Sequence, residues 1–208
     1  MAGRQTRSKG AYGYVHARYI HNRSQKTGRP VTRGLKRLLY YNVYGNQENN
    51  PSGRPRGQIY DQDGREVGYA RYKAWALQQS EAHKYSYRII ISPKGHLLAD
   101  EDFVMALAAA AVTTNLANEF QLIVHRDTDH THAHLLFFTD KTIGKGDLEQ
   151  WKTALRQELM TREQLRAQEK GVSLPEVDKT DDDTTTPQTK KRTRRRRRGK
   201  RKERGLEM

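Results

Sequence analysis

Residues 122–138 read LIVHRDTDHTHAHLLFF, two short apolar runs joined by a polar segment. Apolar runs of this length, bounded by polar residues, predict buried β-strands. The short polar segment between them predicts a tight connection between antiparallel neighbours. The stretch therefore predicts a hairpin at the centre of a sheet, and it holds four of the chain's eight histidines.

The spacing of these histidines predicts a metal site. Side chains i and i+2 share one face of a strand, so His132 and His134 project together, and hairpin pairing brings His125 beside them. Three neutral imidazoles form a compact divalent-metal site with open coordination positions. The alternative is a set of surface histidines without a ligand, but buried polar groups are costly unless they are satisfied. His130 fits two roles, a fourth ligand or a phosphate contact.

The rest of the chain alternates strand and helix patterns. Strands are predicted at 12–21 and 85–92, and helices at 32–44, 68–79, 100–118 and 147–170. Residues 45–58, rich in Gly, Asn and Pro, predict a long loop that is followed by a turn. The pattern predicts an α+β fold in which helices cover one face of a central antiparallel sheet.

Composition limits the functional classes. The chain has no cysteine, so any metal is held by nitrogen and oxygen ligands. The net charge of +15 lies at the two ends: residues 1–37 carry ten Lys or Arg and no acid, and 190–204 carry twelve and one acid. The middle of the chain is mildly acidic. No apolar run approaches a membrane span, and we expect a cytoplasmic protein without membrane insertion.

The same patterns divide the chain into four segments. Residues 1–11 are expected to be a mobile basic N-terminus, and 12–145 a folded domain. Residues 146–171 predict a charged C-terminal helix that ends at Gly171. Residues 172–208, acidic and then polybasic, predict a disordered tail, because such sequences bury too little apolar surface to fold.

The histidine segment resembles the third motif of the MOB-type conjugative relaxases of the HUH endonuclease superfamily. It is most similar to the branch that contains the T-DNA border nickase, whose pattern is His-x-Asp/Asn-x-x-His-Pro-His-x-His. Only Thr131 departs from that pattern, in place of proline. Residues 15–20, 38–45 and 88–93 are similar to the family's first strand, its nucleophile segment and its second motif. The resemblance implies that 12–145 is a relaxase-like catalytic domain with the palm-like HUH fold.

The order of the tyrosines favours this family over its relatives. All eleven tyrosines precede the histidine segment, and relaxases place the nucleophile before it, whereas replication initiators and single-strand transposases place it after. The branch tends to show Tyr-x-x-Arg-x-Gly. Anchoring that pattern on Gly45 implies that Tyr40 is the nucleophile, with Tyr41 and Tyr44 as alternatives, although Val43 stands where the family has Arg.

The resemblance implies site- and strand-specific nicking of single-stranded DNA at a transfer origin. Mg²⁺ or Mn²⁺ would be held by three histidines, and tyrosine attack would leave a 5′-phosphotyrosyl intermediate, which starts conjugative transfer or mobilisation of a plasmid or integrative element. Asp127 is the candidate to orient a ligand histidine or to take the tyrosine's proton. The candidate DNA-binding residues are Arg18, Arg33, Lys36 and Arg37.

The implied partners are accessory relaxosome proteins and a secretion coupling protein. Two alternative functions stay open at this point. One is a rolling-circle replication initiator, which uses the same chemistry at a replication origin. The other is an accessory DNA-binding protein that kept the fold and lost cleavage.

Overall fold

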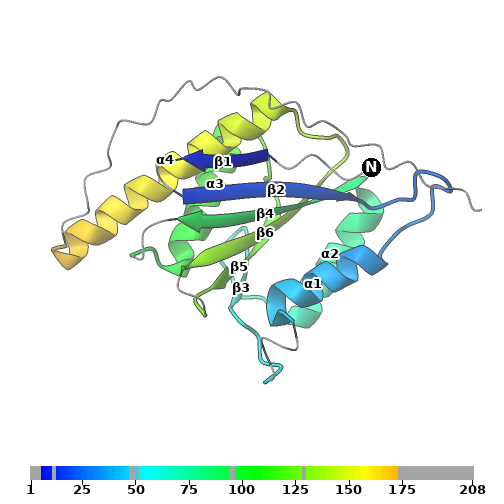
Figure 1. Ribbon diagram of the computed structural model, residues 1–208, viewed down its shortest axis with the longest axis horizontal. Helices are drawn as coiled ribbons and strands as arrows, with labels where there is room; N and C mark the ends of the chain where they lie inside the picture. The colour runs from blue at the N-terminus through cyan, green and yellow to red at the C-terminus, as the bar shows by residue number, and fades with distance from the viewer. Residues whose placement is uncertain are drawn as a thin grey trace, which may run out of the picture. The chain divides into compact units, whose positions relative to one another are not determined.

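The computed structural model contains a six-stranded antiparallel sheet in the order β1-β2-β4-β6-β5-β3 (Figure 1). It describes residues 6–10, 13–46, 50, 52–93, 97–127 and 130–172, the first of these ranges by its backbone alone. The two strands of the histidine segment pair directly with each other near the middle of this order. The strands are β1 (Thr6–Gly10), β2 (Gly13–His21), β3 (Ile59–Asp61), β4 (Tyr85–Pro93), β5 (Phe120–His125) and β6 (His132–Thr139).

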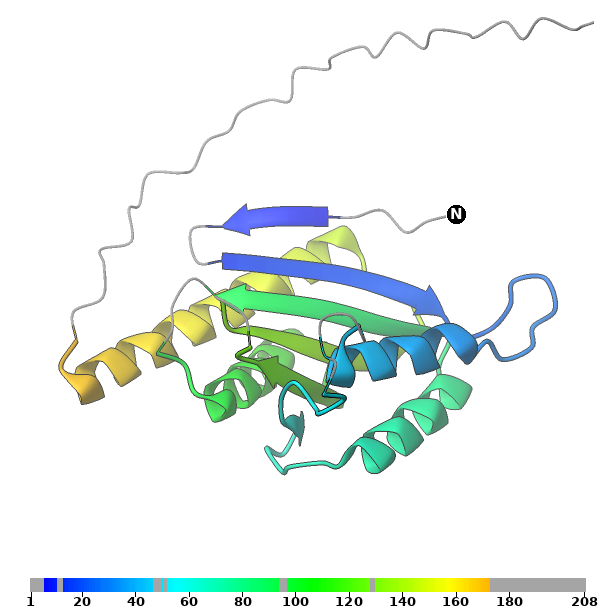
Figure 2. The same ribbon diagram turned by 60° about the horizontal axis from the view of Figure 1, so that its bottom comes forward.

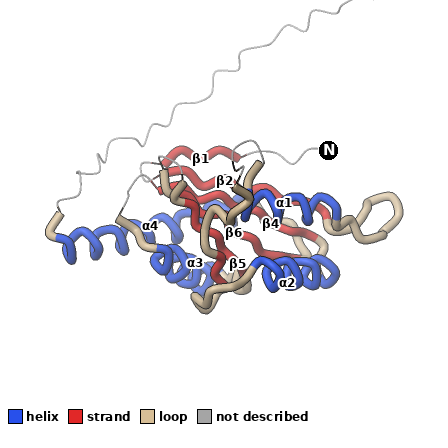
Figure 3. The backbone as a smooth tube through the Cα atoms, turned by 90° about the horizontal axis from the view of Figure 1, so that it is seen from below, coloured by secondary structure: helices blue, strands red, loops and turns tan. Residues whose placement is uncertain are grey.

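Helices cover both faces of this sheet, and the prediction of helices on one face was wrong. The helices are α1 (Arg33–Tyr44), α2 (Tyr69–Ala82), α3 (Asp100–Thr114) and α4 (Lys145–Lys170). The α1–α2 pair and the α3–α4 pair lie on different sides of the strands (Figures 2 and 3).

Two separate apolar cores account for this arrangement. Leu122 and Leu135 point to one face and pack with residues of α3 and α4, including Trp151. Their chain neighbours Ile123 and Leu136 point to the opposite face and pack with residues of α1 and α2. Because both faces of β5 and β6 are buried, their sequences are continuously apolar rather than alternating.

Most predicted elements are confirmed within a few residues, and the exceptions lie at the sheet edges. Part of the predicted mobile N-terminus, Thr6–Gly10, forms β1 and pairs with β2. The predicted 45–58 loop is followed by the short edge strand β3, which pairs with β5. Helix α4 belongs to the same core as the sheet. The predicted tail lies, apart from Val172, outside the described residues.

The histidine motif thus lies at one end of β5 and β6, on the sheet face that carries α1 and α2. Across the parts of the chain that the structure describes, no helix has the length and apolar character needed to cross a membrane.

Candidate metal centre

Three histidines converge at the end of the β5–β6 pair where β5 ends and β6 begins. His125 lies directly opposite His132, and His134 lies opposite Ile123, so all three imidazoles project from the same sheet face. The ring centroids are 5.0 Å (His125–His132), 4.8 Å (His125–His134) and 5.3 Å (His132–His134) apart. One potential ligand atom from each lies within 4.8 Å of the other two. The predicted trio is therefore brought together.

Hydrogen bonds to two backbone carbonyls fix the tautomers of His125 and His132. His125 Nε2 donates to the Asn42 carbonyl at 2.7 Å, and His132 Nδ1 donates to the His130 carbonyl at 3.1 Å. A carbonyl oxygen only accepts, so these ring nitrogens carry the protons. The remaining nitrogens, His125 Nδ1 and His132 Nε2, face each other at 3.2 Å with their lone pairs.

This separation fits one shared cation. Two nitrogens that are each about 2.1 Å from one ion, as in histidine metal sites, lie at about this distance from each other. The third histidine, His134, adds another ring nitrogen to the site. Its buried Nδ1 has no hydrogen-bond partner among the described residues. The residues present therefore fit a divalent metal.

The electrostatic setting keeps His125 and His134 in the form that binds a metal. Burial lowers the pKa of His134 to about 2, and the neighbouring rings together with Arg88 and Arg56 act in the same direction. Burial also lowers the pKa of His125 to about 4, with a further contribution from Arg56. Both imidazoles are neutral at neutral pH, which is the form that binds a metal.

Among the described residues, the hydrogen bonds of the Asp127 side chain go to Arg56 and not to a ligand histidine, so its predicted orienting role has no hydrogen bond to support it. Its carboxylate accepts two hydrogen bonds from Arg56, at 2.5 Å from Nε and 3.1 Å from Nη2. The Arg56 hydrogen bond lowers the pKa of Asp127, and the same bond raises the pKa of Arg56. The orienting bond to His125 comes instead from the Asn42 carbonyl, which carries no sequence signal because every residue has one.

His130 contributes its backbone carbonyl to the site and has an exposed side chain. Among the described residues, the group of potential ligands comprises the three buried or half-buried histidines and does not include His130. Its predicted role as a fourth ligand is therefore not supported by this arrangement. Its neighbour Asp129 lies outside the described residues.

The loop before β3 packs tightly against β5, and Gly57 makes this contact possible. A Cβ atom at this position would lie 1.9 Å from the Val124 carbonyl oxygen and 3.1 Å from His125 Cδ2. Arg56, the preceding residue, is thereby held beside Asp127, and its backbone N–H also donates to the Val43 carbonyl. Sequence reasoning missed both residues, because a glycine in a Gly- and Pro-rich loop gives no signal of a close contact.

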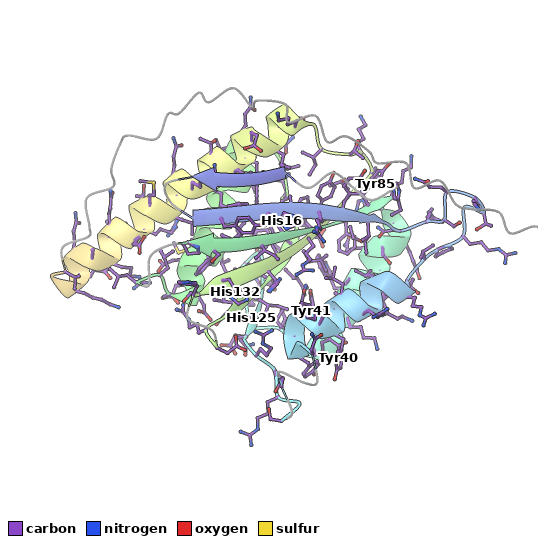
Figure 4. All side chains as sticks on the ribbon, viewed as in Figure 1. His16, Tyr40, Tyr41, Tyr85, His125 and His132 are labelled. Carbon is purple, nitrogen blue, oxygen red and sulfur yellow. The ribbon has the colours of Figure 1, made fainter. Side chains whose placement is uncertain are left out.

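Of the three candidate tyrosines near the end of α1, Tyr40 and Tyr44 pack together, whereas Tyr41 has a different neighbour. The Tyr40 ring lies 4.8 Å from Tyr44, which in turn packs against Tyr69 of α2 at 5.2 Å. The Tyr41 ring lies under the Arg88 guanidinium, 5.6 Å from its carbon. Figure 4 shows Tyr41 between α1 and His125, with Tyr40 farther out.

Tyr41 interacts electrostatically with two arginines that also act on the histidines. Burial lowers the pKa of Arg88, and the Tyr41 phenol opposes that effect. Tyr41 also acts on Arg56, the arginine that depresses the pKa values of His125 and His134. Tyr41 therefore shares its charged neighbours with the trio, whereas Tyr40 shares its neighbours with Tyr69.

The predicted DNA-binding residues separate into two groups. Arg18 is exposed on β2, directly opposite Arg88 of β4, on the face that carries the histidines. The other three are exposed on the first turns of α1, where Arg33 lies roughly 13 Å along the helix axis from Asn42. They are Arg33, Lys36 and Arg37. Arg88 itself was missed as a site residue, although a charge inside a strand, directly before the run of three isoleucines, was a readable signal.

The comparisons with known proteins leave the site to be interpreted from its own geometry. The chain matches no family model, no curated protein and no solved structure.

Proposed function

We propose that this protein is a metal-dependent relaxase that nicks one strand of DNA at a transfer origin and begins conjugative transfer or mobilisation. One observation carries the proposal. The Asn42 carbonyl, next to Tyr41 in α1, accepts a 2.7 Å hydrogen bond from the ligand candidate His125. This bond ties the helix with the candidate nucleophile to the metal centre.

His125, His132 and His134 would hold a divalent ion, Mg²⁺ or Mn²⁺. When bound, such an ion polarises a phosphate group and offsets the negative charge that develops in the transition state. Three protein ligands would leave coordination positions for substrate oxygens, on the side of the half-buried His132. The Asn42 and His130 carbonyls orient the rings of His125 and His132.

Tyr41 is the nucleophile that the geometry favours. Its oxygen attacks the phosphorus, the P–O3′ bond breaks, and the proton lost by the phenol is balanced by the one that the 3′ oxygen gains. The product is a 5′-phosphotyrosine and a free 3′-OH, and the phosphodiester energy is kept for later rejoining. Tyr40 and Tyr44 remain the alternatives, but their ring contacts are with each other and with Tyr69.

The partner is accordingly single-stranded DNA, with accessory relaxosome proteins and a coupling protein in the cytoplasm as further proposed partners. The order of the groups along the chain, tyrosine before histidines, favours a relaxase over a rolling-circle initiator. The unsatisfied His134 Nδ1 and the convergent trio support a metal site. A non-cleaving accessory protein that kept the metal stays the alternative, which the adduct assay separates from the nickase.

The test is a covalent adduct assay. The full chain is incubated with Mn²⁺ and labelled single-stranded oligonucleotides that tile its own mobile element, and adducts are resolved on a denaturing gel. We expect a metal-dependent adduct that Tyr41→Phe abolishes and Tyr40→Phe retains within about tenfold, because only the first removes the attacking oxygen. An absence of adduct on every oligonucleotide contradicts the proposed function, and loss in Tyr40→Phe alone reassigns the nucleophile.

A further inference from the structure

Two arginines face each other across the central sheet beside the metal centre. Arg18 of β2 is the direct cross-strand partner of Arg88 of β4. Directly opposite side chains have Cβ atoms about 4.5–5.5 Å apart, and like charges at such positions destabilise a sheet. No carboxylate among the described residues lies within salt-bridge distance of either guanidinium. Within the described part of the chain, these two adjacent positive charges therefore have no carboxylate partner.

The Arg88 side chain is particularly constrained. It is half-buried, and its Nε is a buried donor without a hydrogen-bond partner among the described residues. The Tyr41 ring lies on one side of the guanidinium, with its centroid 5.6 Å from the guanidinium carbon. An oxyanion is the group that satisfies a fixed, unpaired guanidinium most effectively, since arginine presents several donors in one plane.

The pair also lies one step along the sheet from the histidines. His16, Ile90 and His134 form one cross-strand row, and Arg18 and Arg88 belong to the next row on the same face. These rows are about 6.8 Å apart along the strands. Arg88 is thus a diagonal neighbour of His134, at a distance that one nucleotide of an extended strand can span.

We propose that Arg18 and Arg88 together bind a backbone phosphate of the substrate strand, the one adjacent to the scissile phosphate. The pair would fix the direction of the strand across β2, β4 and β6 and hold the scissile phosphate between Tyr41 and the histidines. The inference rests on the proposed function in taking single-stranded DNA as the source of the phosphate.

The test measures binding of a fluorescent eight-nucleotide oligo(dT) in EDTA, where no cleavage takes place. Full-length proteins are compared, all with Arg194 to Arg198 replaced by glutamine so that tail charge does not mask the site. The variants are Arg18→Gln, Arg88→Gln and the double variant. The matched control is Arg71→Gln with Lys73→Gln, which removes the same charge from exposed positions of α2.

We expect each single variant to bind about tenfold more weakly, because each loses a charge-assisted hydrogen bond to the same phosphate. The double variant should fall well short of a hundredfold loss, since the two effects are coupled. The logarithm of the binding constant falls linearly with the logarithm of the salt concentration, and removal of one phosphate contact should make this slope shallower by about 0.7. A double variant that matches the α2 control in affinity and in slope overturns the inference.

Two further comparisons keep the result interpretable. If Arg88→Gln fails to fold by circular dichroism, Arg88→Lys, which keeps the charge but loses the planar donor set, is expected to give an intermediate loss of affinity. Arginine-dependent binding without any covalent adduct would support the phosphate site and contradict the nickase. A normal covalent adduct, together with oligonucleotide binding that the arginine substitutions do not weaken, would support the nickase and contradict the phosphate site.

Discussion

Tyr40 and Tyr41 are adjacent in the sequence, but successive residues of an α-helix project about 100° apart, so their side chains have different neighbours. Tyr40 packs against Tyr44, four residues on, as side chains one helical turn apart do. The family pattern, anchored on Gly45, selected Tyr40. The ring contacts favour Tyr41, because the anchoring glycine fixes the helix end and not the direction of each side chain.

Burial of His134 predicts a pH-dependent stability of the metal-free protein. Its pKa is about 2 in the folded state and about 6.5 in an unfolded chain, so between these values the unfolded state binds more protons. Stability is therefore fully present above pH 6.5 and falls as the pH drops. From pH 7 to pH 5 this residue should contribute a loss on the order of 1–2 kcal/mol in chelator. His134→Leu should show a correspondingly shallower decline in urea unfolding, and an unchanged decline would contradict the burial argument.

The Arg56–Asp127 pair predicts a positioning role for Asp127 rather than proton transfer. Because its carboxylate is engaged by Arg56, Asp127→Asn should slow adduct formation by less than about tenfold, whereas loss of a general base costs 10²–10⁴-fold. Arg56→Ala and Asp127→Ala should be non-additive in thermal unfolding, since each removes the same contact. A thousandfold loss in Asp127→Asn, measured as the single-turnover rate, would restore the role of base.

At the scale of elements, the contact between the 52–58 loop and β5 holds Arg56 at the site. Gly57→Ala places a Cβ atom against the Val124 carbonyl, so the loop must shift. We expect a loss of about 1–3 kcal/mol in the free energy of unfolding and weaker metal binding, because His125 Cδ2 is also in contact. Gly34→Ala is the matched control, since a Cβ atom there meets open space. Equal free energies of unfolding for the two variants would show that the Gly57 contact with β5 does not fix the position of the loop.

The elements also show what the sequence could and could not predict. Helix α1 and strands β4, β5 and β6 were confirmed because apolar periodicity follows directly from one buried face or two. Edge strand β3 was missed because three residues are too few to display a period. The trio followed from i, i+2 spacing and hairpin pairing. Asn42 and Arg88 were missed, because contacts between distant segments are set by tertiary packing.

The sequence indicated only in part that helices cover both faces of the sheet. Amphipathicity says that a helix buries one side, but it does not say against which face of a sheet. The continuous apolar runs of β5 and β6 carried the missing information, because a sheet with one solvated face would alternate. The buried pattern of β5, in which every residue is inaccessible, is what covered faces on both sides require.

At the scale of the whole molecule, metal binding should stabilise the fold. The ligands come from β5 and β6, and His125 is bonded to α1, so an ion links elements from the middle of the sheet to a covering helix. At an Mn²⁺ concentration of 100 times its Kd, we expect a rise in Tm of about 5–10 °C. His132→Ala should remove the shift. An identical shift in that variant would place the binding site elsewhere.

The central claim, that Tyr41 attacks DNA at the histidine centre, is tested most directly by locating the covalent bond. Trypsin releases residues 38–56 as one peptide, since it does not cleave before Pro55, and this peptide contains all three candidate tyrosines. After reaction with an oligonucleotide and Mn²⁺, followed by nuclease trimming, tandem mass spectrometry identifies the modified residue. The account predicts a nucleotide phosphate on Tyr41, absent in EDTA. A phosphate on Tyr40 or Tyr44, or none, would contradict it.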